Sequence, residues 1–340
     1  MKNLVQDFID EVSKKVSVSE FIINGNDNVY VEKEGELIRM DIKFSDSDIE
    51  NFCQDIASYN KKPFGSETPT LDGNLPDGSR VNFIHKDYTK TSHAITIRRY
   101  LKNISHFDAN AGIFGLNERW ITFLKYLVKA RVNLIVSGGT GVGKTTLLNL
   151  LLQEIGPKER IITIEDTREL QFNHTDIVRL EARNNISEKG LSIRDLVKNS
   201  LRMRPDRIIL GEVRGGEVFD LLQAMNTGHQ GSMTSIHSNS PSECLSRLEN
   251  LFLLSGYDLP LKALRYQVCS AIDFIIQVKR DRQGKRVISQ IIEVGNMDGD
   301  RILIQDVGLF KNDKLEFSGL VPSCMDRLHQ AGLPRDFFIK

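Results

Sequence analysis

The chain of 340 residues is long enough for about two domains of roughly 150 residues each. Hydrophobic residues make up 40% and charged residues 26%, which is typical of a folded protein and excludes an extensively disordered chain. Lysine plus arginine number 45, as do aspartate plus glutamate. The resulting net charge of zero argues against a nonspecific nucleic-acid binder, because such a protein needs a basic surface.

The sequence predicts a cytoplasmic protein that reaches a membrane only through a partner. Its apolar stretches are shorter than the roughly 20 residues of a spanning helix. The N-terminus lacks the apolar segment and cleavage site of a signal peptide. Four scattered cysteines without a CxxC pair predict neither a disulfide framework nor a zinc site, and we interpret them as buried small side chains: Cys53, Cys244, Cys269 and Cys324.

The first 100 residues predict a small α+β domain. Apolar residues at helical spacing predict a helix over 1–16, and cap-type residues begin a second helix over 45–62. Short β-rich runs bounded by Asn, Gly and Asp predict strands near 20–23, 29–32, 37–40, 81–85 and 94–98. Asp72-Gly73 and Asp77-Gly78 predict two turns. A segment rich in Gly, Asn and Ser over 101–115 predicts a linker.

Residues 116–340 predict an α/β domain with a parallel sheet. A helix follows Leu116, with its apolar face marked by Trp120, Phe123, Leu124, Leu127 and Val128. Short apolar runs predict strands over 133–137, 161–164 and 207–210, and another helix covers 144–155. Strands that alternate with helices indicate a parallel sheet covered on both faces.

The strongest chemical signal is the motif Gly138-Gly-Thr-Gly-Val-Gly-Lys144-Thr145, which lies between an apolar strand and an apolar helix. It fits G-x-x-x-x-G-K-[ST] in the context that this pattern requires. The glycines let backbone N–H groups surround a phosphate, and the helix N-terminus adds a positive dipole. We expect Lys144 to reach the β- and γ-phosphates and Thr145 to hold Mg²⁺; the alternative is a turn without a ligand. The phosphate-binding candidates are Gly138, Gly139, Thr140, Gly141, Val142, Gly143, Lys144, Thr145 and Thr146.

Acidic residues follow two of the predicted strands, where phosphate-loop enzymes need carboxylates for the metal and the attacking water. Glu212 follows the strand 207–210, and we predict that it helps to hold Mg²⁺. Glu165 and Asp166 follow another apolar strand, where neighbouring carboxylates can supply a general base. Asp166 could equally cap a turn. We favour Glu165 over Glu212 as the residue that orients the water.

Two histidines, His229 and His237, lie in a segment rich in Gly, Ser and Thr over 227–238. No third soft ligand is near them in sequence, so a metal site is disfavoured. We predict that this segment senses the γ-phosphate, and a structural role for the histidines is the alternative. Arginines that could stabilise the charge of phosphoryl transfer recur in both domains: Arg80, Arg98, Arg99, Arg202, Arg204, Arg207 and Arg214.

The glycine-rich motif, the two strands that end in acidic residues and the histidine-containing segment are four elements. In their order along the chain they resemble the secretion and pilus traffic ATPases, the superfamily that powers type II and type IV secretion and type IV pili. That family calls them Walker A, the Asp box, Walker B and the His box. They match here at 138–145, 164–169, 208–214 and 228–237. The helix before Walker B, together with the sequence of 200–207, also looks like the family.

Three further segments resemble the Tad (tight adherence, Flp) pilus motor ATPases and their close relatives in type IV secretion. They are 71–82, 94–99 and the ending 324–338. The tetracysteine zinc module of many type II secretion and pilus-extension relatives is missing from this sequence.

The resemblance implies a RecA-like ATPase domain over 116–340 and a PAS-like sensing domain over 1–100. It implies a hexameric ring in which ATP lies between the two domains, and arginines of the same or a neighbouring chain complete the site. The matching positions are Arg80, Arg98 and Arg99, of which we rank Arg98 and Arg80 first. His237 would report the γ-phosphate to the next subunit, and His229 is a further nucleotide-binding candidate.

We therefore expect an ATP- and Mg²⁺-dependent hexameric motor at the cytoplasmic face of the inner membrane. It would drive Tad-type pilus assembly or retraction, or secretion, through an inner-membrane platform protein. A type IV secretion traffic ATPase is the alternative. A DNA translocase or helicase ring, a nucleotide-switched assembly module and a small-molecule kinase are further alternatives. The zero net charge argues against the first of these, and the paired acids Glu165 and Glu212 argue against the second.

Overall fold

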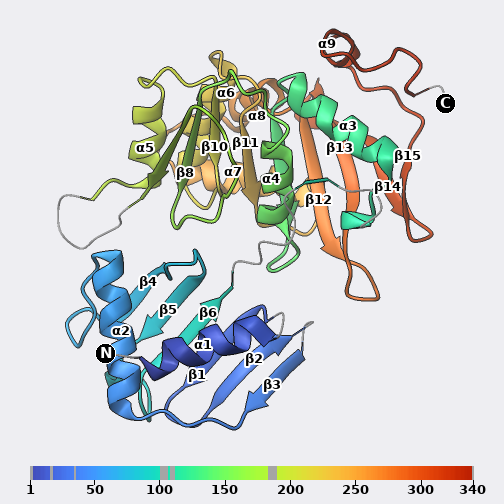
Figure 1. Cartoon of the computed structure of the whole chain (residues 1–340). Helices are drawn as coiled ribbons and strands as arrows, with labels where there is room; N and C mark the ends of the chain where they lie inside the picture. The colour runs from blue at the N-terminus through green and yellow to red at the C-terminus, as the bar shows by residue number, and fades with distance from the viewer. Residues whose placement is uncertain are drawn as a thin grey trace. The chain divides into compact units, whose positions relative to one another are not determined.

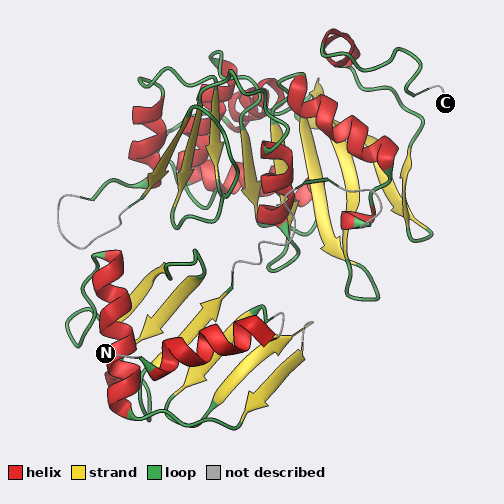
Figure 2. Cartoon of the chain, viewed as in Figure 1, coloured by secondary structure: helices red, strands yellow, loops and turns green. Residues whose placement is uncertain are grey.

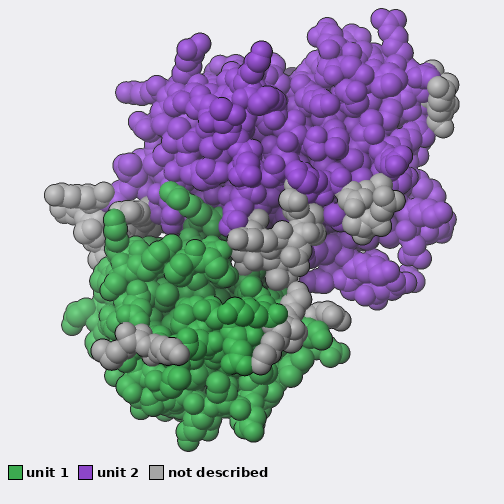
Figure 3. Space-filling view, viewed as in Figure 1, with its two compact units in different colours: residues 1–103, 167–169 green, residues 104–166, 170–340 purple. Residues whose placement is uncertain are grey.

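The structure is a computed structural model that describes residues 3–15, 18–33, 36–99, 106–107, 112–182 and 190–338. The chain divides into two compact units, residues 1–103 with 167–169 and residues 104–166 with 170–340 (Figure 3). Each unit contains its own sheet (Figures 1 and 2) and its own hydrophobic core.

The first unit contains an antiparallel sheet with the order β3-β2-β1-β6-β5-β4. Alternate strand residues such as Phe21, Phe83 and Ile97 pack against the buried residues of both helices in one core. The elements are α1 (Leu4–Lys15), β1 (Glu20–Asn24), β2 (Val29–Lys33), β3 (Glu36–Met40), α2 (Asp46–Asn60), β4 (Thr70–Asn74), β5 (Arg80–Ile84) and β6 (Ala94–Arg98).

Local sequence explains where α2 begins and ends. Ser45 and Asp48 form a reciprocal capping box at its start, and Lys61 ends it in the left-handed region with φ 54°. The predicted turn at Asp77-Gly78 is present, with Gly78 at φ 89°. The predicted turn at Asp72-Gly73 is wrong, because both residues lie within β4. A Cβ on Gly73 would come within 2.7 Å of the Asn60 side chain, so this glycine allows α2 to approach the strand.

The second unit contains a sheet with the order β15-β14-β13-β12-β7-β11-β10-β8-β9. The strands from β12 to β9 in this order are parallel, as predicted. The sheet is mixed rather than wholly parallel, because β13, β14 and β15 extend it as antiparallel hairpins. The strands are β7 (Leu134–Gly138), β8 (Ile161–Glu165), β9 (Ile177–Glu181), β10 (Arg207–Leu210), β11 (Met233–Ile236), β12 (Phe274–Arg280), β13 (Arg286–Asp298), β14 (Arg301–Lys311) and β15 (Lys314–Phe317).

Helices cover both faces of this sheet (Figure 1). Leu134 and Val136 of β7 pack in the core that contains α3 and α4, whereas Ile135 packs in the opposite core with α5 to α8. This alternation is why the strands are apolar on both faces. The helices are α3 (Glu118–Lys129), α4 (Lys144–Leu152), α5 (Ile193–Ser200), α6 (Glu217–Asn226), α7 (Pro241–Leu253), α8 (Leu261–Ala271) and α9 (Met325–Gln330).

The predicted linker over 101–115 lies mostly outside the described residues, apart from 106–107 and 112–115. The four cysteines are free thiols, of which Cys53 and Cys244 are buried and the other two are partly buried. Among the described residues, no helix combines the length and apolar character needed to cross a bilayer.

Candidate nucleotide site

The phosphate loop, residues 138–145, joins the carboxyl end of β7 to the start of α4. Gly141 and Gly143 have φ angles of 70° and 100°, which favour glycine. A Cβ on Gly138 would lie 2.6 Å from the Val278 carbonyl oxygen of the neighbouring strand. The glycines are therefore required both by the turn and by the close approach of β12, and the loop ends at the helix N-terminus that the motif predicts.

Lys144 begins α4 and is only 7% exposed. Its Nζ donates to the Gly139 carbonyl oxygen at 2.8 Å and lies 3.3 Å from Nδ1 of His237. The ammonium group is thus held beside the loop. A bound phosphate would replace the Gly139 carbonyl oxygen and His237 as its hydrogen-bond acceptor.

Residues from three neighbouring strands meet beside Lys144. Glu212 follows β10, and its carboxylate lies 2.9 Å from Nε2 of His237 and accepts from Arg214 at 2.8 Å. Arg214 also lies 3.6 Å from the carboxylate of Asp166, which follows β8. The predicted residues Lys144, Glu212, Asp166 and His237 therefore form one charged cluster at the carboxyl edge of the sheet.

Glu165 is the last residue of β8 and is 3% exposed. Its Oε1 accepts the backbone N–H of Leu170 at 2.9 Å. A Cβ on Gly211 would lie 3.0 Å from the Glu165 Cγ, so the residue just before Glu212 passes directly over this side chain. The two glutamates consequently occupy adjacent but different environments, one buried and one in an ion-pair network.

The environment of His237 favours its neutral form. Burial lowers the pKa of His237, and although the Glu212 carboxylate acts in the opposite direction, the Lys144 and Arg214 charges add to the lowering. In the tautomer that satisfies both neighbours, Nε2 donates to Glu212 and Nδ1 accepts from Lys144. His237 therefore joins the cation to the carboxylate near neutral pH.

The donor set fits Mg²⁺. Thr145 lies in the first turn of α4, next to Lys144, and Glu212 supplies a carboxylate; hard oxygen ligands of this kind suit Mg²⁺. The described part of the chain contains no group of three or more His, Cys, Asp or Glu residues that could hold a metal ion. An ion here would take its other ligands from phosphate and water, as Mg²⁺ commonly does.

The structure separates the two histidines, because residues 233–236 of the predicted loop form β11. His237 follows the carboxyl end of β11, whereas His229 precedes its amino end. The His229 ring contacts the Ala224 carbonyl oxygen at 3.1 Å. Within this chain, His229 therefore lies at the sheet edge opposite the phosphate loop and is not brought to it.

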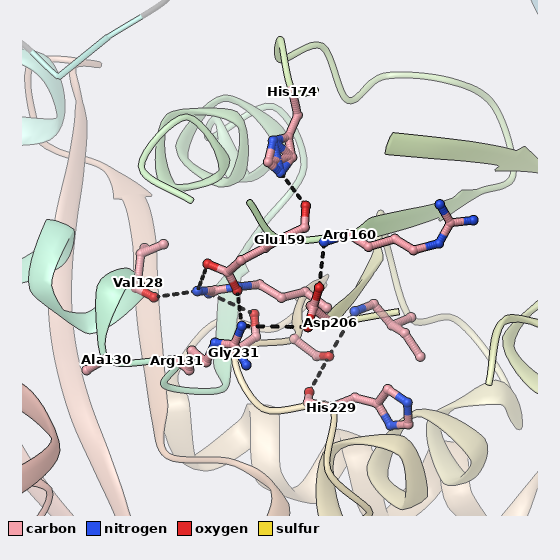
Figure 4. Close-up of polar contacts among 12 residues, drawn as sticks. Val128, Ala130, Arg131, Glu159, Arg160, His174, Asp206, His229 and Gly231 are labelled. Carbon is pink, nitrogen blue, oxygen red and sulfur yellow. Dashed lines mark hydrogen bonds and ion pairs between the residues drawn. The ribbon is translucent and has the colours of Figure 1, made fainter. Parts of the chain in front are cut away.

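A second polar cluster lies at that opposite edge (Figure 4). Arg207 is fully buried and pairs with Glu159 through two hydrogen bonds of 2.8 and 2.9 Å. Its guanidinium also donates to the carbonyl oxygens of Val128 and Gly231, and Arg131 lies 2.9 Å from Glu159. The sequence offers Arg207 as a candidate for phosphate chemistry. In the structure it instead joins the amino end of β10 to the residues that precede β11.

The predicted first-unit arginines lie on neighbouring strands. Arg80 of β5 and Arg98 of β6 are register partners, and Arg99 follows β6. Arg98 pairs with Glu20 at 2.8 Å, and Arg80 pairs with Glu169, which belongs to the same compact unit. Their role in ATP binding stays a prediction.

The sequence names Arg214 only as one of several candidate arginines, whereas the structure brings its guanidinium to both Glu212 and Asp166. The signal in the sequence is its position two residues after Glu212, which is weak because most arginines are solvated. The sequence prediction omits Phe114 and Arg286, whose atoms would lie within 3.2 Å of a Cβ on Gly143. No local pattern links these residues to the loop, because the contacts join distant parts of the chain.

Comparison with known proteins identifies the family. Residues 4–314 match the family model described as "Type II/IV secretion system protein". A putative conjugal transfer protein of Mycobacterium tuberculosis is 34% identical over 290 residues, which cover 83% of this chain and 82% of that protein. The type IV secretion system protein PtlH of Bordetella pertussis is 39% identical over 263 residues, which cover 68% of this chain and 76% of that protein.

Solved structures support the fold. The pilus retraction motor PilT with bound ADP matches with a TM-score of 0.61 and 18% identity, over 96% of this chain and 86% of that one. This likeness shows the mixed α/β architecture alone. With the family match over most of the chain, and the phosphate loop and carboxylates in place, the chain belongs to the type II/IV secretion system family of ATP-hydrolysing traffic ATPases.

Proposed function

We propose that this chain is the traffic ATPase of a type IV secretion or conjugation system and that it hydrolyses ATP·Mg²⁺ at the phosphate loop. The observation that carries this proposal is the cluster in which Lys144, His237, Glu212 and Arg214 meet at the carboxyl edge of the sheet. The printed names of the M. tuberculosis and B. pertussis relatives, for conjugal transfer and type IV secretion, support the choice of system.

The residues divide the chemistry among them. Lys144 and the loop amides bind the phosphates, and Thr145 with Glu212 holds Mg²⁺. Glu165, which is buried and close to Glu212, orients the attacking water. Arg214 holds Glu212 in position. As ATP enters, Lys144 leaves His237 for the γ-phosphate, so the loss of this contact reports the γ-phosphate to His237.

The working form is a ring of six chains that acts on an inner-membrane platform protein. Arg98 and Arg80, from the same or a neighbouring subunit, complete the charge stabilisation. An arginine that contacts the developing negative charge raises the rate of phosphoryl transfer by about 10³- to 10⁵-fold.

A Tad pilus motor is the second candidate. The segments 71–82, 94–99 and 324–338 favour it, because they resemble that branch as well as its relatives in type IV secretion. The two candidates share the same ATPase chemistry and differ in the platform on which the motor acts.

Replacement of Lys144 by alanine tests the enzyme. We expect phosphate release to fall to background while the melting temperature without nucleotide stays within a few degrees of wild type. Lys158→Ala, in the loop before β8, is the matched control and should keep full turnover. Unchanged turnover by Lys144→Ala would refute the site.

Capture on the purified ring tests the system. Wild-type protein and the Lys144→Ala variant are incubated with detergent-solubilised inner membrane of the source organism in the presence of ATP, and the captured proteins are identified by mass spectrometry. A type IV secretion platform protein supports the proposal, and a Tad platform protein favours the second candidate. Stimulation of turnover by DNA in a parallel titration would favour a translocase instead.

A further inference from the structure

Gln277 is a polar residue in the otherwise apolar buried part of β12. The five residues from Phe274 to Val278 are all buried, and the other four are apolar. Gln277 itself is 3% exposed, and its Oε1 has no hydrogen-bond partner among the described residues. An unpaired buried amide oxygen costs stability, so packing alone does not account for a glutamine at this position.

The amide nitrogen of Gln277 reaches across the sheet. β7 lies between β12 and β11, and Gln277 is in register with Ser137 of β7, which is in register with Ile236 of β11. The chain continues from Ile236 through His237 to Ser238. The Ser238 carbonyl oxygen accepts from Nε2 of Gln277 at 3.2 Å, and this bond is buried. A residue of β12 therefore holds the segment that leaves β11, although β7 separates the two strands.

Ser137 holds the same residue through its side chain. Ser137 is fully buried, and its hydroxyl forms a hydrogen bond with the hydroxyl of Ser238. The Ser238 hydroxyl also donates to the Ser240 carbonyl oxygen at 3.1 Å, so Ser137 is the donor when both bonds are made. The residue directly after His237 is thus fixed at two atoms, one bonded from β7 and the other from β12.

The sheet is irregular at Gln277. On its other side β12 pairs with β13, and the register shifts between Gln277 and Val278, where Ser289 of β13 is the extra residue. The Ser289 hydroxyl donates to the Gln277 carbonyl oxygen at 3.3 Å. A bulge bends its strand and changes the direction of nearby side chains, and bulges are common beside active sites. This bulge therefore lies opposite the residue that reaches Ser238.

His237 is the site residue whose position depends on these contacts. Its Nδ1 lies 3.3 Å from Nζ of Lys144, and its Nε2 lies 2.9 Å from the Glu212 carboxylate. The imidazole side chain is 37% exposed, so packing holds it only in part, and its place depends on the backbone on either side. The pairing of β11 with β7 fixes the backbone before His237, and the bonds to Ser238 fix the backbone after it.

We propose that Gln277, together with Ser137, is a positioning residue that fixes the backbone of His237, so that the imidazole joins Lys144 to Glu212. The inference rests on the proposed ATPase function, in which the loss of the Lys144–His237 contact reports the γ-phosphate. Gln277 acts through Ser238 and His237 and not on the phosphates. The unpaired amide oxygen is the stability cost of placing a donor where β12 alone would favour an apolar side chain.

Gln277→Met in the full-length chain tests the proposal, because methionine is flexible enough to fill the space and has no N–H donor. We expect kcat at saturating ATP to fall about fivefold to tenfold, since a misplacement of about 1 Å can cost up to about 10²-fold in rate. The affinity for ADP should stay near wild type, because ADP has no γ-phosphate. The melting temperature should also stay near wild type, because the substitution removes the unpaired oxygen together with the hydrogen bond.

The matched control is Gln305→Met on β14, which removes an amide that donates to the Val321 carbonyl oxygen at 3.1 Å and should keep full kcat. A merely structural role of Gln277 predicts the opposite pattern, a lower melting temperature with normal kcat, and that result would overturn the proposal. If Gln277→Met does not fold, Ser137→Ala removes the other bond to Ser238 and carries the same expectations.

Two further measurements link the effect to His237. Adding Gln277→Met to His237→Ala should lower kcat no further, because both changes act through the same side chain. Diethyl pyrocarbonate, which acylates neutral imidazole, should modify His237 of nucleotide-free Gln277→Met about twofold to tenfold faster than in wild type, the effect of losing one hydrogen bond. His329 of α9 is the reference histidine within the same chain.

An additional loss of kcat in the double variant, or labelling of His237 at the wild-type rate, would overturn the positioning role. Unchanged turnover by Lys144→Ala would instead overturn the ATPase site on which this inference rests.

Discussion

Glu165 and Glu212 are adjacent in space but differ in their surroundings. Glu165 is 3% exposed, and one oxygen accepts a backbone N–H, whereas Glu212 contacts His237 and Arg214. A carboxylate in a charged, solvent-accessible network suits a metal ligand. A buried carboxylate beside it suits a group that orients water, because a dry environment strengthens its interaction with the reacting atoms.

The first prediction separates these two roles. Glu165→Gln should lower the turnover number by about 10²- to 10⁴-fold, the range typical of a lost general base, while the affinity for ADP stays near wild type. Glu212→Gln should also hydrolyse poorly, and it should need a higher Mg²⁺ concentration for half-maximal activity. Steady-state kinetics over a Mg²⁺ titration check both, with Glu316→Gln on β15 as the control. A Glu165→Gln variant of normal turnover would contradict the assignment.

Arg214 gives the second prediction, because its guanidinium contacts both Glu212 and Asp166. Arg214→Ala should reduce kcat about tenfold with little change in the affinity for ADP, since Glu212 loses the group that orients it. Arg214→Lys should recover part of kcat because it restores the charge. The control is Arg202→Ala, an exposed arginine in the same region of sequence. Equal losses in the Ala and Lys variants would show that charge alone at this position does not restore kcat, and would contradict the expected recovery.

At the scale of elements, the phosphate loop is shaped by neighbours that are distant in sequence. A Cβ on Gly143 would lie 3.2 Å from the Phe114 ring and 3.1 Å from Arg286. Phe114 itself has φ 56°, which is rare for a bulky residue, and it is buried. The loop therefore has no room on the side where Phe114 and Arg286 pack.

Two glycines of the loop give the third prediction. Gly143→Ala should lower the melting temperature and weaken ADP binding, because Gly143 has φ 100° and its added methyl group meets Phe114 and Arg286. Gly139→Ala is the matched control, since the nearest atom to its Cβ lies at 3.9 Å and its φ is not in the left-handed region. Calorimetric titration with ADP and thermal melting compare the two, and similar behaviour would contradict the packing argument.

The opposite edge of the sheet is held by the Arg207–Glu159 pair (Figure 4). Arg207 joins the start of β10 to the Gly231 carbonyl oxygen before β11 and to the Val128 carbonyl oxygen at the end of α3. Burial opposes ionisation of Glu159, but hydrogen bonds and charge from Arg207 outweigh it and lower the pKa of this carboxyl. The pair therefore stays ionised inside the fold.

The fourth prediction concerns this buried pair and pH. Arg207→Met leaves a carboxylate without its main partner, so the free energy of unfolding should fall by about 3–5 kcal/mol. Because folding lowers the pKa of Glu159, its stabilising contribution is complete above the usual carboxyl range and is lost as pH falls through the folded pKa. The unfolding free energy of Glu159→Gln should thus depend less on pH below about pH 5 than that of wild type. Denaturant melts from pH 7 to pH 3 test this, and identical slopes would contradict it.

The sequence predicts the elements of this sheet unevenly. The strands over 134–138, 161–165 and 207–210 are apolar and followed by chemical motifs, so composition was sufficient to find them. For β11 the sequence predicts a loop instead, because its residues are Met-Thr-Ser-Ile between polar neighbours. The buried Ser235 hydroxyl of this strand donates to the Gly211 carbonyl oxygen at 2.7 Å, and such a tertiary partner is invisible in a local window.

At the scale of the whole molecule, each unit has an independent core. The fifth prediction concerns Arg98 of the first unit and asks which subunit's ATP site it completes. Arg98→Ala and Lys144→Ala rings should each be nearly inactive, because charge stabilisation by an arginine contributes about 10³- to 10⁵-fold. If Arg98 acts on the neighbouring subunit, subunits of the two variants mixed in one ring should regain turnover at sites that contain both native residues.

Mixing experiments at several ratios, with particle mass compared with the 38.6 kDa chain, measure this effect. Arg39→Ala, which removes a cation from β3 of the same sheet, is the control. No recovery at any ratio would place Arg98 in its own subunit's site, and full activity of Arg98→Ala would remove it from the site altogether.

The sequence by itself determined the phosphate loop, the two carboxyl-bearing strands that follow it and the α/β character of the second unit. These features depend on neighbours a few residues apart, because glycine conformation, helix capping and apolar periodicity are local. The tertiary structure alone decided that His237 rather than His229 lies beside Lys144, that Arg214 joins Glu212 to Asp166 and that antiparallel hairpins extend the parallel sheet. Those outcomes depend on strand pairing and side-chain packing between segments up to 140 residues apart, such as Arg280 on Gly141, which no local pattern encodes.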